Sequence, residues 1–515
     1  MKNLPIGIQT LSEIVRTNCV YVDKTRLIHR LVTMGKAYFL SRPRRFGKSL
    51  TVSVLRELFE GNKTLFNGLW IENNWDWNKI NPVIHISFSE WDYHELGLSA
   101  AISEALHSVA AEKGIVLTKT TVKSQFKELL KAVYDKAGAV VLLIDEYDKP
   151  IIQYLEDNHL KQAVANRKIL KNFYSTVKDA DKLLRFVFIT GISKFTKVSI
   201  FSDLNHLDDI SLDPNYATLT GYTQEELEAN FDDYLAETRS QMNVSREALL
   251  AQIKLWYNGY SWDGNTSVYN PFGTLNFLSK KVFGNYWFST GTPTFLLEQM
   301  KRHGQFALNP LEVDSSFFEK YDLEDVDITL LLFQTGYLTI KKVDTWTGYR
   351  WLDFPNKEVH DSLYSFFVSE LTRRSQRPNS GLTMRDLQYA LETRNLPRVK
   401  VIINAYLSEM PESVFRHSSE GLYHGLVHII FTYLGTFIQS EVHSAHGQAD
   451  AVVQTDTDVY VFEFKMNESA DAALAQIHQK GYADKYRASD KTITAIGINF
   501  DENSRKIADW KTELL

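Results

Sequence analysis

A loop near the start of the chain combines residue types that bind phosphate. Within LSRPRRFGKSL (40–50), Gly47, Lys48 and Ser49 match the second half of the pattern G-x-x-x-x-G-K-[ST]. The glycine lets the backbone approach an anion, the lysine reaches the β and γ oxygens of a nucleotide, and the serine can ligate magnesium. Arg42 stands where the pattern has its first glycine. The loop predicts a nucleotide site, against the alternative of a basic loop that only faces water.

A pair of carboxylates follows a strongly apolar run. In GAVVLLIDEYDKP (138–150), Asp145 and Glu146 come directly after five apolar β-forming residues. A buried parallel strand delivers such acids at its carboxyl end, where the first can hold the magnesium shell and the second can orient or deprotonate the attacking water. We assign metal binding to Asp145 and catalysis to Glu146. An acidic helix start is the alternative for the pair.

Another apolar run ends in polar residues that could sense a γ-phosphate. The stretch LLRFVFITG (183–191) ends with Thr190 next to its last glycine, and Ser193 follows shortly after. Ordinary turn residues are the alternative for both. AYFLS (37–41) and PVIHISFSEWD (82–92) predict two more strands, and segments of helical periodicity separate these runs. The alternation of strands and helices predicts a doubly wound α/β sheet.

The last hundred residues hold a second set of residues with chemical potential. Asp450 opens one strand-like run, and Glu463 and Lys465 lie two residues apart in DVYVFEFKM (458–466), hence on one face of that strand. A metal-dependent phosphodiesterase uses two carboxylates to hold a cation that activates water, and a lysine to position the nucleophile or offset charge. We predict that Asp450 and Glu463 bind magnesium and that Lys465 acts with them in catalysis.

Two simpler interpretations compete with that site. An exposed strand with alternating charges would also show E-x-K, but valines and phenylalanines surround Glu463 and Lys465, and burying a charge without a function is costly. A zinc site is the other possibility, and we reject it because His424 and His428 simply share a helix face. His443 and His446 lie nearby in the sequence and are weighed with them as zinc ligands.

The elements around these residues follow a fixed order. A helical pattern in YHGLVHIIFTYLG precedes three strand-like runs, FIQSEVHS, ADAVVQT and DVYVFEFKM. The helix DAALAQIHQKGYADKY and the strand KTITAIGINF follow. The predicted order is αβββαβ.

Composition limits the class of protein. With 515 residues, the chain is too long for one ordinary core, so we expect two or three domains. A formal net charge of -6 excludes a globally basic coat for nucleic acid but allows a local basic groove. The single cysteine, Cys19, requires no oxidising compartment, and no segment has the roughly 20 apolar residues of a membrane span. We expect a cytoplasmic protein with no membrane partner.

Three parts are predicted along the chain. Residues 1–215 form the nucleotide-binding domain, 216–410 form a helical lid and middle region, and 411–515 form the domain with the second chemistry. Within the middle, GYLTIKKVDTWTGYRWLDFPNKEV (336–359) alternates around a polar turn and predicts a β-hairpin. Aromatic and basic residues occur together here, which could form a platform for single strands. Ordinary core aromatics under amphipathic helices are the favoured interpretation.

The first half of the chain resembles a known family. GIQTLSEIVRTNCVYVDKT, YFLSRPRRFGKSL, LLIDEYDKP and FITGISKF are similar, in order and spacing, to the AAA-ATPase-like family of bacterial and archaeal proteins. That family's loop is commonly R-P-R-R-x-G-K-S, so the resemblance implies that an arginine at the first loop position is normal and does not indicate a dead site. We assign nucleotide binding to Arg44, Arg45, Phe46, Gly47, Lys48, Ser49, Asp145 and Thr190, and metal binding to Ser49 and Asp145.

The C-terminal part resembles the PD-(D/E)XK nuclease superfamily, in the version that follows AAA-ATPase-like domains. Asp450 matches the motif aspartate, and Glu463 and Lys465 match the E-x-K element. The resemblance implies roles for Gln476 and Tyr482 in the next helix, and for Glu441 as an auxiliary acid. A restriction-endonuclease-like fold is therefore expected. Ala449 stands where the superfamily name has proline, and Gln448 stands where relatives often carry arginine.

These observations lead to one main hypothesis and several rivals. The main one is an ATP-binding protein, and an ATPase, coupled to a magnesium-dependent nuclease that acts on DNA through its C-terminal domain. A homo-oligomer is compatible with it. The first rival is a signalling or scaffold ATPase whose nuclease-like domain only binds, and the second is a nuclease with an inert nucleotide-binding clamp. A small-molecule kinase is the remote alternative.

Overall fold

The chain divides into two units that are described separately. In the computed structural model, unit 1 comprises Met1–Phe295 with Glu312–Glu358, and unit 2 comprises Leu296–Leu311 with Val359–Leu515. The structure describes residues 1–156, 159–193, 200–201, 204, 206–290, 311–319, 327–372, 384–409, 426, 429–434, 439–442, 449–501, 504 and 506–515.

A five-stranded parallel sheet forms the centre of unit 1. Its strands are β2 (Val83–Ser87), β3 (Val140–Asp145), β4 (Leu184–Gly191), β1 (Ala37–Ser41) and β5 (Asp208–Asp209), in this spatial order. The runs of valine, isoleucine, leucine and phenylalanine are buried on both faces, as parallel sheets require. Strand β4 lies between β1 and β3, so the loops after these three strands open at one edge. The predicted strands are confirmed.

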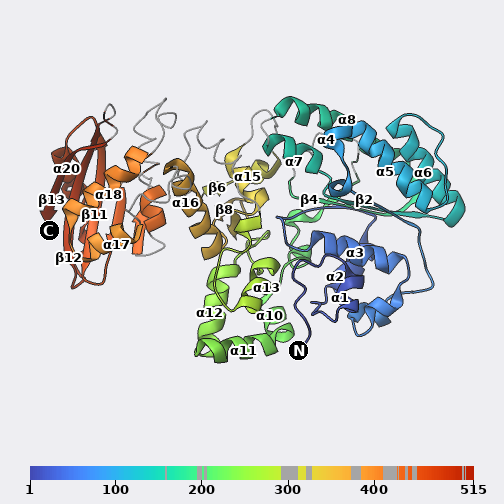
Figure 1. Cartoon of the computed structure of the whole chain (residues 1–515), viewed down its shortest axis with the longest axis horizontal. Coiled ribbons are helices and arrows are strands. Elements are labelled where there is room, and N and C mark those ends of the chain that lie inside the picture. The colour runs from blue at the N-terminus through green and yellow to red at the C-terminus, as the bar shows by residue number, and fades with distance from the viewer. Residues whose placement is uncertain are drawn as a thin grey trace. The chain divides into compact units, whose positions relative to one another are not determined.

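Helices cover both faces of this sheet, which confirms the doubly wound fold (Figure 1). On one side lie α1 (Leu11–Arg16), α2 (Thr25–Met34) and α3 (Lys48–Phe59), and on the other lie α5 (Leu98–Glu112), α6 (Val122–Ala137) and α8 (Leu160–Asp179). The short α4 (Tyr93–Leu96) precedes α5, and α7 (Lys149–Glu156) precedes α8. Apolar residues of α2 and α3 form the main core with residues of β1, β2, β3 and β4.

The middle of the chain adds a helical subregion to unit 1. It contains α10 (Gln224–Asn230), α11 (Asp232–Met242), α12 (Arg246–Tyr257) and α13 (Pro271–Lys280), which pack around their own apolar core. Thr223 and Glu226 form a capping box at the start of α10. The same Glu226 is ion-paired at 2.6 Å with Lys24 at the start of α2, so this subregion is fixed to the N-terminal part of unit 1.

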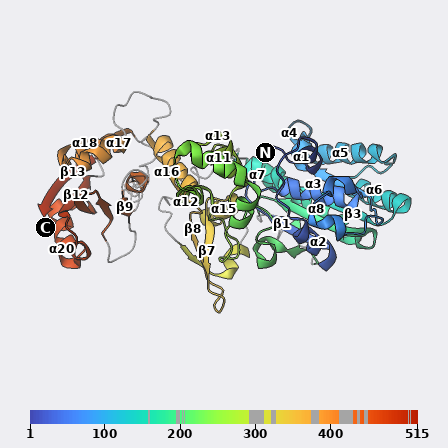
Figure 2. The same ribbon diagram turned by 90° about the horizontal axis from the view of Figure 1, so that it is seen from below.

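A β-hairpin follows α15 (Ile328–Thr335). Its strands, β7 (Thr339–Val343) and β8 (Arg350–Asp353), pair antiparallel and belong to a three-stranded sheet in the order β6-β8-β7, where β6 is Leu311–Val313. The predicted hairpin is confirmed. Figure 2 shows it as a narrow yellow projection from the helices and strands around its base.

Unit 2 contains a mixed sheet in the order β13-β12-β11-β10-β9. The strands are β9 (Gln439–Val442), β10 (Ala451–Gln454), β11 (Asp458–Met466), β12 (Thr492–Asp501) and β13 (Lys506–Leu514). Helix α20 (Ala470–Lys480) connects the parallel pair β11 and β12, while the other neighbours pair antiparallel. The predicted strand–strand–strand–helix–strand order is confirmed, and residues 426 and 429–434 of the helix predicted before it are helical. Strand β13 was not predicted.

Further helices of unit 2 precede this sheet in the chain. They are α16 (Lys357–Thr372), α17 (Met384–Glu392) and α18 (Leu396–Glu409). Helix α18 contacts β13, and the side chain of Asn404 accepts a hydrogen bond from Ile507 N at 2.8 Å. The Tyr460 hydroxyl donates to Leu391 O at 2.7 Å, so α17 and α18 are part of the packing around the nuclease-like sheet. The three-part division at residues 215 and 410 stays a prediction.

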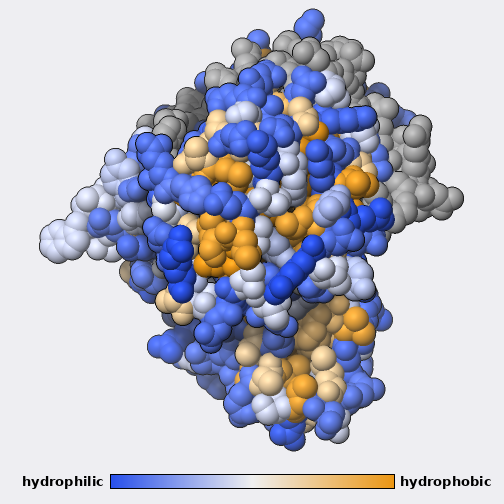
Figure 3. Space-filling view, turned by 90° about the vertical axis from the view of Figure 1, so that its left-hand side faces the viewer, coloured by the Kyte–Doolittle hydropathy of each residue, from blue (hydrophilic) through white to orange (hydrophobic). Residues whose placement is uncertain are grey.

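The surface offers few features that identify a partner by themselves. None of the helices described is both long and apolar enough to cross a bilayer. The face in Figure 3 is mostly hydrophilic, with apolar side chains gathered in small patches. Scattered apolar groups of this kind are ordinary on protein surfaces and indicate no partner.

Candidate nucleotide and nuclease sites

The predicted phosphate loop connects β1 to α3 through two positions of left-handed backbone. Arg45 has φ 67° and Gly47, which caps α3, has φ 90°. These values turn the chain so that the first amides of α3 point toward the loop, the arrangement that binds phosphate at a helix N-terminus. Glycine adopts such a φ without steric cost, whereas the backbone of Arg45 is strained there because the residue has a side chain.

Arg42, at the first loop position, is a buried structural residue. Only 1% of it is exposed, and its Nη1 donates to Ser41 O at 2.9 Å and to Ser211 O at 2.7 Å. The guanidinium also lies 3.9 Å from the ring centroid of Trp262. Burial lowers the pKa of Arg42 to about 9, so the group remains charged near neutral pH. At this position a glycine would make the loop flexible enough to turn, whereas Arg42 holds the loop in place through its side-chain contacts.

Other parts of unit 1 fix the same loop from outside. Phe46 packs edge-on against Tyr260 at 4.7 Å and against Trp262 at 5.5 Å between ring centroids. The indole of Trp287 donates to Arg44 O at 3.0 Å. A Cβ at Gly336 would clash with the ring of Pro43, so this glycine allows close approach to the loop. The loop is therefore held by residues that are distant in sequence.

The side chain of Lys48 lies in the phosphate loop, where two carbonyl groups of the loop hold it. It is 7% exposed, and its Nζ donates to Arg42 O and Pro43 O, both at 2.9 Å. Burial lowers the pKa of Lys48, and the nearby carboxylates of Asp145 and Asp148 partly oppose this shift. Two carbonyl oxygens satisfy the ammonium only weakly compared with a phosphate, so an anion in this loop would improve its environment.

The two acids after β3 differ in their surroundings. Asp145 is 5% exposed, its carboxylate is hydrogen-bonded to the side chain of Ser49, and burial raises its pKa. Glu146 has φ 51° and lies nearer solvent, where its carboxylate is ion-paired with Lys149 at 3.4 Å. The inner acid with Ser49 can hold a cation, and the outer acid can reach a water. This is the division of roles predicted from sequence.

Thr190, near the end of β4, and Ser193, after it, both make hydrogen bonds within unit 1. Thr190 is fully buried and its hydroxyl donates to Leu40 O at 2.8 Å, which fixes β4 against β1. Ser193 donates through its amide at 2.6 Å and its hydroxyl at 2.8 Å to one carboxylate oxygen of Asp148. Asp148 therefore links the loop after β3 to the loop after β4. A sensor role for Thr190 stays a prediction.

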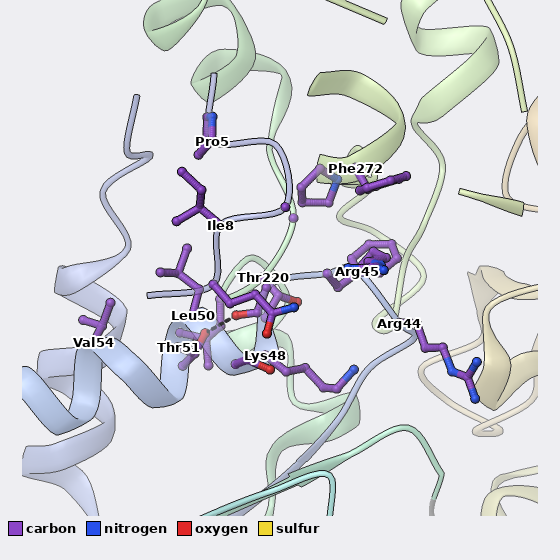
Figure 4. Close-up of a pocket in the computed structure, with 18 of the residues that line it drawn as sticks. Pro5, Ile8, Arg44, Arg45, Lys48, Leu50, Thr51, Val54, Thr220 and Phe272 are labelled. Carbon is purple, nitrogen blue, oxygen red and sulfur yellow. Dashed lines mark hydrogen bonds between the residues drawn. The ribbon is translucent and has the colours of Figure 1, made fainter. Parts of the chain in front are cut away.

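These groups surround a cavity of about 590 Å³ (Figure 4). Arg44, Arg45, Phe46, Gly47, Lys48, Ser49 and Glu146 all line it, as does Asp148. Residues from the N-terminal segment, such as Ile8, and from the helical subregion, such as Phe272, complete the wall. Figure 4 shows Arg45 beside Phe272, with the guanidinium 5.2 Å from that ring, while Arg44 points away from them. The volume and the mixed lining suit a nucleotide.

The second predicted site lies in unit 2, where β10, β11 and α20 meet. Ala451 pairs with Phe462, which places Asp450 next to Glu463 across the two strands. A carboxylate oxygen of Asp450 accepts a hydrogen bond from Phe464 N at 2.7 Å. The structure thus brings both predicted carboxylates to one end of the strand pair.

Gln476 connects the acid and the lysine of this cluster. Its amide nitrogen donates to Glu463 Oε1, and its amide oxygen accepts from Lys465 Nζ at 2.7 Å. Lys465 Nζ lies 3.7 Å from Glu463 Oε1, and the Tyr482 hydroxyl lies 3.3 Å from the Gln476 nitrogen. Gln476 therefore contacts the other three side chains, and the roles that the resemblance implies for them stay predictions.

Glu463 has an environment that favours either a proton or a cation. It is 2% exposed, and burial together with the neighbouring Asp450 raises its pKa to about 8, against the opposing effect of Lys465. Its Oε2 is buried and has no hydrogen-bond partner among the described atoms. A buried carboxylate oxygen without a partner is costly, and a divalent cation next to Asp450 would satisfy it. The two acids thus fit a magnesium ion.

Some predicted residues fall outside what the structure describes. Glu441 is described only by its backbone, which pairs with Val452. His424, His428, His443, His446 and Gln448 lie outside the described residues. Within the described part of the chain, no three His, Cys, Asp or Glu side chains form one metal-binding group.

Sequence reasoning missed several residues that build the nucleotide site. Asp148 lies three residues after Asp145 in IDEYD, between the end of β3 and the start of α7, and its place directly after a strand that ends in acids was an available signal. The contacts of Arg42 with Ser211 and of Phe272 with Arg45 join positions far apart in sequence, and no local pattern announces them.

Comparison with known proteins supports the assignment of both domains. Residues 5–201 match the family model described as "Predicted AAA-ATPase", and residues 418–510 match the "PD-(D/E)XK nuclease superfamily" model. The "Uncharacterized protein in vnfD 5'region" of Azotobacter chroococcum mcd 1 is 38% identical over 529 residues, covering 100% of this chain and 99% of the relative. The chain belongs to the AAA-ATPase-like family. Its C-terminal domain belongs to the PD-(D/E)XK nuclease superfamily.

Solved structures with detectable similarity are distant from this AAA-ATPase-like protein. The Aeropyrum pernix ORC2 protein, in ADPNP–ADP complexes, shares 8% identity with a TM-score of 0.29, covering 67% of this chain and 92% of that one. The Aeropyrum pernix ORC1 protein in complex with DNA shares 12% identity with a TM-score of 0.25, covering 68% and 93%. The fold assignment rests on the strand order and the family matches.

Placing a glycine at position 42, as in the general loop pattern, is expected to destabilise the fold of this AAA-ATPase-like protein. Arg42→Gly removes the donor to Ser211 O and leaves a gap against Trp262, so the free energy of unfolding should fall by about 3 kcal/mol. Arg45→Gly is the matched control, because it makes the same change at an exposed position with positive φ and should cost less than about 1 kcal/mol. Denaturant unfolding followed by tryptophan fluorescence measures both. Equal losses would contradict the structural role of Arg42.

The AAA-ATPase-like protein should also release a proton when its nuclease domain binds a cation. Without metal, Glu463 holds its proton up to about pH 8, so cation affinity should rise about tenfold per pH unit below about pH 8 and level off above it. Between about pH 4.5, where an ordinary glutamate titrates, and about pH 8, the folded state binds a proton that the unfolded state has lost, so the metal-free fold should lose stability as pH rises.

Titration calorimetry with Mg²⁺ or Mn²⁺ in buffers of different ionisation enthalpy counts the released protons. Glu463→Gln should abolish this release at the nuclease site, while Glu468→Gln, an exposed neighbour, should retain it. Release that is unchanged in Glu463→Gln would show that another group titrates.

Proposed function

We propose that this protein binds ATP with magnesium in unit 1, hydrolyses it, and uses the nucleotide state to control a magnesium-dependent nuclease in unit 2 that acts on DNA. The cluster of Asp450, Glu463, Lys465 and Gln476 carries the proposal. Within the described residues, Oε2 of the buried Glu463 has no hydrogen-bond partner, and Lys465 Nζ lies 3.7 Å from Oε1 of the same acid. A domain that had retained only its fold would have no need to keep charges in this costly arrangement.

The nucleotide part of the proposal rests on the cavity around the phosphate loop. Lys48 and the first amides of α3 would bind the β- and γ-phosphates, and Ser49 with Asp145 would hold the magnesium ion. On phosphate binding, Lys48 Nζ would exchange the carbonyls of Arg42 and Pro43 for phosphate oxygens. The cavity accommodates the rest of the nucleotide between the N-terminal segment and the helical subregion.

Hydrolysis would depend on Glu146. Its carboxylate lines the cavity and would orient the attacking water or accept its proton. Because Glu146 is ion-paired with Lys149 at 3.4 Å, that pair would have to open when a water is bound. Asp148 and Ser193 connect the loops after β3 and β4, and they would carry any shift at the phosphate to the next loop.

In the nuclease domain, Asp450 and Glu463 would hold magnesium, which when bound supplies a Lewis acid that polarises the phosphodiester and lowers the pKa of water. Lys465 would position the attacking water and offset the negative charge that develops on phosphate. Gln476 would keep Glu463 and Lys465 in register by bonding both. Tyr482 supports the amide of Gln476.

The proposal also names DNA as the substrate and the cytoplasm as the location. The superfamily match supports a nucleic acid, and we propose DNA. A net charge of -6 means that binding must rely on local contacts and should weaken steeply with salt. The free thiol of Cys19 supports the reducing cytoplasm. A homo-oligomer remains part of the proposal.

The test is cleavage of linear, circular and single-stranded DNA with magnesium or manganese, with and without ATP. Lys465→Ala should lower the cleavage rate at least about 100-fold, because the lysine would position the attacking water and offset charge on the reacting phosphate. Lys48→Ala should leave the magnesium site of the nuclease domain intact but remove the response of cleavage to ATP. Lys506→Ala, an exposed lysine on β13, is the matched control and should cut like wild type.

Two results would contradict the proposal in different ways. Wild type that binds ATP but cuts no DNA with either metal would indicate a nucleotide-switched binding module. Cleavage that is lost in Lys465→Ala but equally responsive to ATP in Lys48→Ala would indicate a nuclease with an inert nucleotide domain.

A further inference from the structure

The tip of the β7–β8 hairpin carries the most exposed large apolar side chain in the described part of the chain. Trp346 is 96% exposed, and the neighbouring Tyr349 is 41% exposed. An indole presents about 200 Å² of mainly apolar surface, which proteins normally bury. Figure 2 shows that the hairpin backbone projects from its surroundings, in agreement with the high exposure of Trp346.

The turn that holds Trp346 is well defined. One carboxylate oxygen of Asp344 accepts from Trp346 N at 2.9 Å and from Thr347 N at 3.3 Å. The backbone of Asp344 also pairs with Tyr349 O and with Gly348 N, both at 2.8 Å, and Gly348 supplies φ 77°. These bonds hold the pKa of Asp344 below its usual range. The tip is therefore a constructed turn that points an aromatic ring outward.

The base of the hairpin is fixed to the segment that contacts the phosphate loop. Thr339 Oγ1 accepts from Ser261 N at 2.7 Å and donates to Ser261 O at 2.8 Å. Tyr260 and Trp262, on either side of Ser261, are the residues that pack on Phe46 and Arg42. The exposed tip thus extends from a rigid base.

The hairpin carries three cationic side chains, of which Lys342 is exposed on β7 with its Nζ 4.6 Å from the ring centroid of Trp351. The ammonium of Lys341 donates to Pro355 O at 2.8 Å, and the guanidinium of Arg350 lies 5.1 Å from the ring centroid of Phe318. The two acids of the hairpin accept from backbone amides: Asp344 in the turn, and Asp353 from Phe354 N at 2.7 Å. Lys342 is therefore the cation on β7 that a ligand could contact.

We propose that the hairpin tip binds single-stranded nucleic acid, with an unpaired base stacked on Trp346 and a phosphate contacted by Lys342 of β7. The inference rests on the proposed function, to which it adds a substrate contact in unit 1. An exposed aromatic ring on an element that also carries an exposed lysine is a combination that binds unpaired nucleotides, and stacking contributes about 1–3 kcal/mol per base. A protein partner fits less well. Protein interfaces need roughly 800 Å² per side around an anchor, whereas Trp346 has Thr345, Thr347 and Gly348 as its neighbours in the turn.

The test measures binding of a fluorescent oligothymidine of about 15 nucleotides by the full-length Lys465→Ala variant in a chelator, so that cleavage cannot interfere. Adding Trp346→Ala should raise Kd about tenfold, and Trp346→Phe should restore most of the affinity, because any aromatic ring can stack. Trp70→Ala, a half-exposed tryptophan of the same unit, is the matched control and should bind normally.

An abasic strand of equal length separates stacking from phosphate contact. Trp346→Ala should bind the abasic strand as well as its parent does, because the ring then has no base to stack on. Lys342→Ala should weaken both strands and reduce the slope of log affinity against log salt by about 0.7. Repeating the measurement with an oligouridine of equal length compares RNA with DNA. The proposal is supported if Trp346→Ala loses affinity for whichever of the two strands binds more tightly.

The outcomes also separate this inference from the nuclease proposal. If wild type cuts DNA and Trp346→Ala binds every strand as its parent does, the contact is wrong and the nuclease stands. If wild type cuts nothing but binding depends on Trp346, the contact stands and the nuclease falls. If the protein binds no single strand, the hairpin proposal is overturned whatever the cleavage result.

Discussion

The buried guanidinium of Arg42 is the contact on which the organisation of unit 1 depends. A charge with 1% exposure is tolerated only where hydrogen bonds and an aromatic face replace water, and Ser211 O and Trp262 provide them. These partners come from the segment after β5 and from the helical subregion. The phosphate loop therefore cannot take its shape until both have folded against it. In the general pattern, a glycine lets the loop form from its own backbone, whereas here the loop is completed by the rest of the unit.

That dependence links the nucleotide to the parts of unit 1 farthest from it in sequence. Trp262 and Tyr260 contact the loop, Ser261 between them bonds Thr339, and Thr339 begins the exposed hairpin. Trp287 reaches the loop from another direction, and its amide donates to the buried Glu358 at 2.6 Å. A change in the loop on phosphate binding would act on packed aromatic groups, which respond by discrete rearrangement more readily than by gradual deformation.

The two sites follow the same electrostatic principle with opposite signs. Lys48 is a buried cation whose pKa is lowered by burial, and Glu463 is a buried acid whose pKa is raised to about 8 for the same reason. Each is held by neutral groups, carbonyls in one site and the amide of Gln476 in the other. Each would gain most from a ligand of opposite charge. The cost of burying these groups is thus the source of affinity for phosphate and for a cation.

Sequence patterns predicted what depends on local order and missed what depends on distant contact. The strand, loop and helix around Lys48, and the acids at the end of β3, follow from hydrophobic periodicity and motif spacing. The roles of Gln476 and Tyr482 came only from family resemblance, because a single glutamine or tyrosine in a sequence does not indicate a site by itself. The partners of Arg42 lie about 170 residues away, so no local pattern shows them. Strand β13 was missed since its exposed, charged residues lack the apolar alternation of a half-buried strand.

The most direct measurement is a structure of the full chain with a non-hydrolysable ATP analogue and magnesium. The account predicts the triphosphate in the loop, with Lys48 Nζ moved from Arg42 O and Pro43 O to the phosphate oxygens. It also predicts magnesium between Ser49 and Asp145, while the Arg42 guanidinium stays on Trp262. A loop that excludes the nucleotide while Lys48 keeps its carbonyl partners would contradict it, and so would Arg42 leaving Trp262 to bind phosphate.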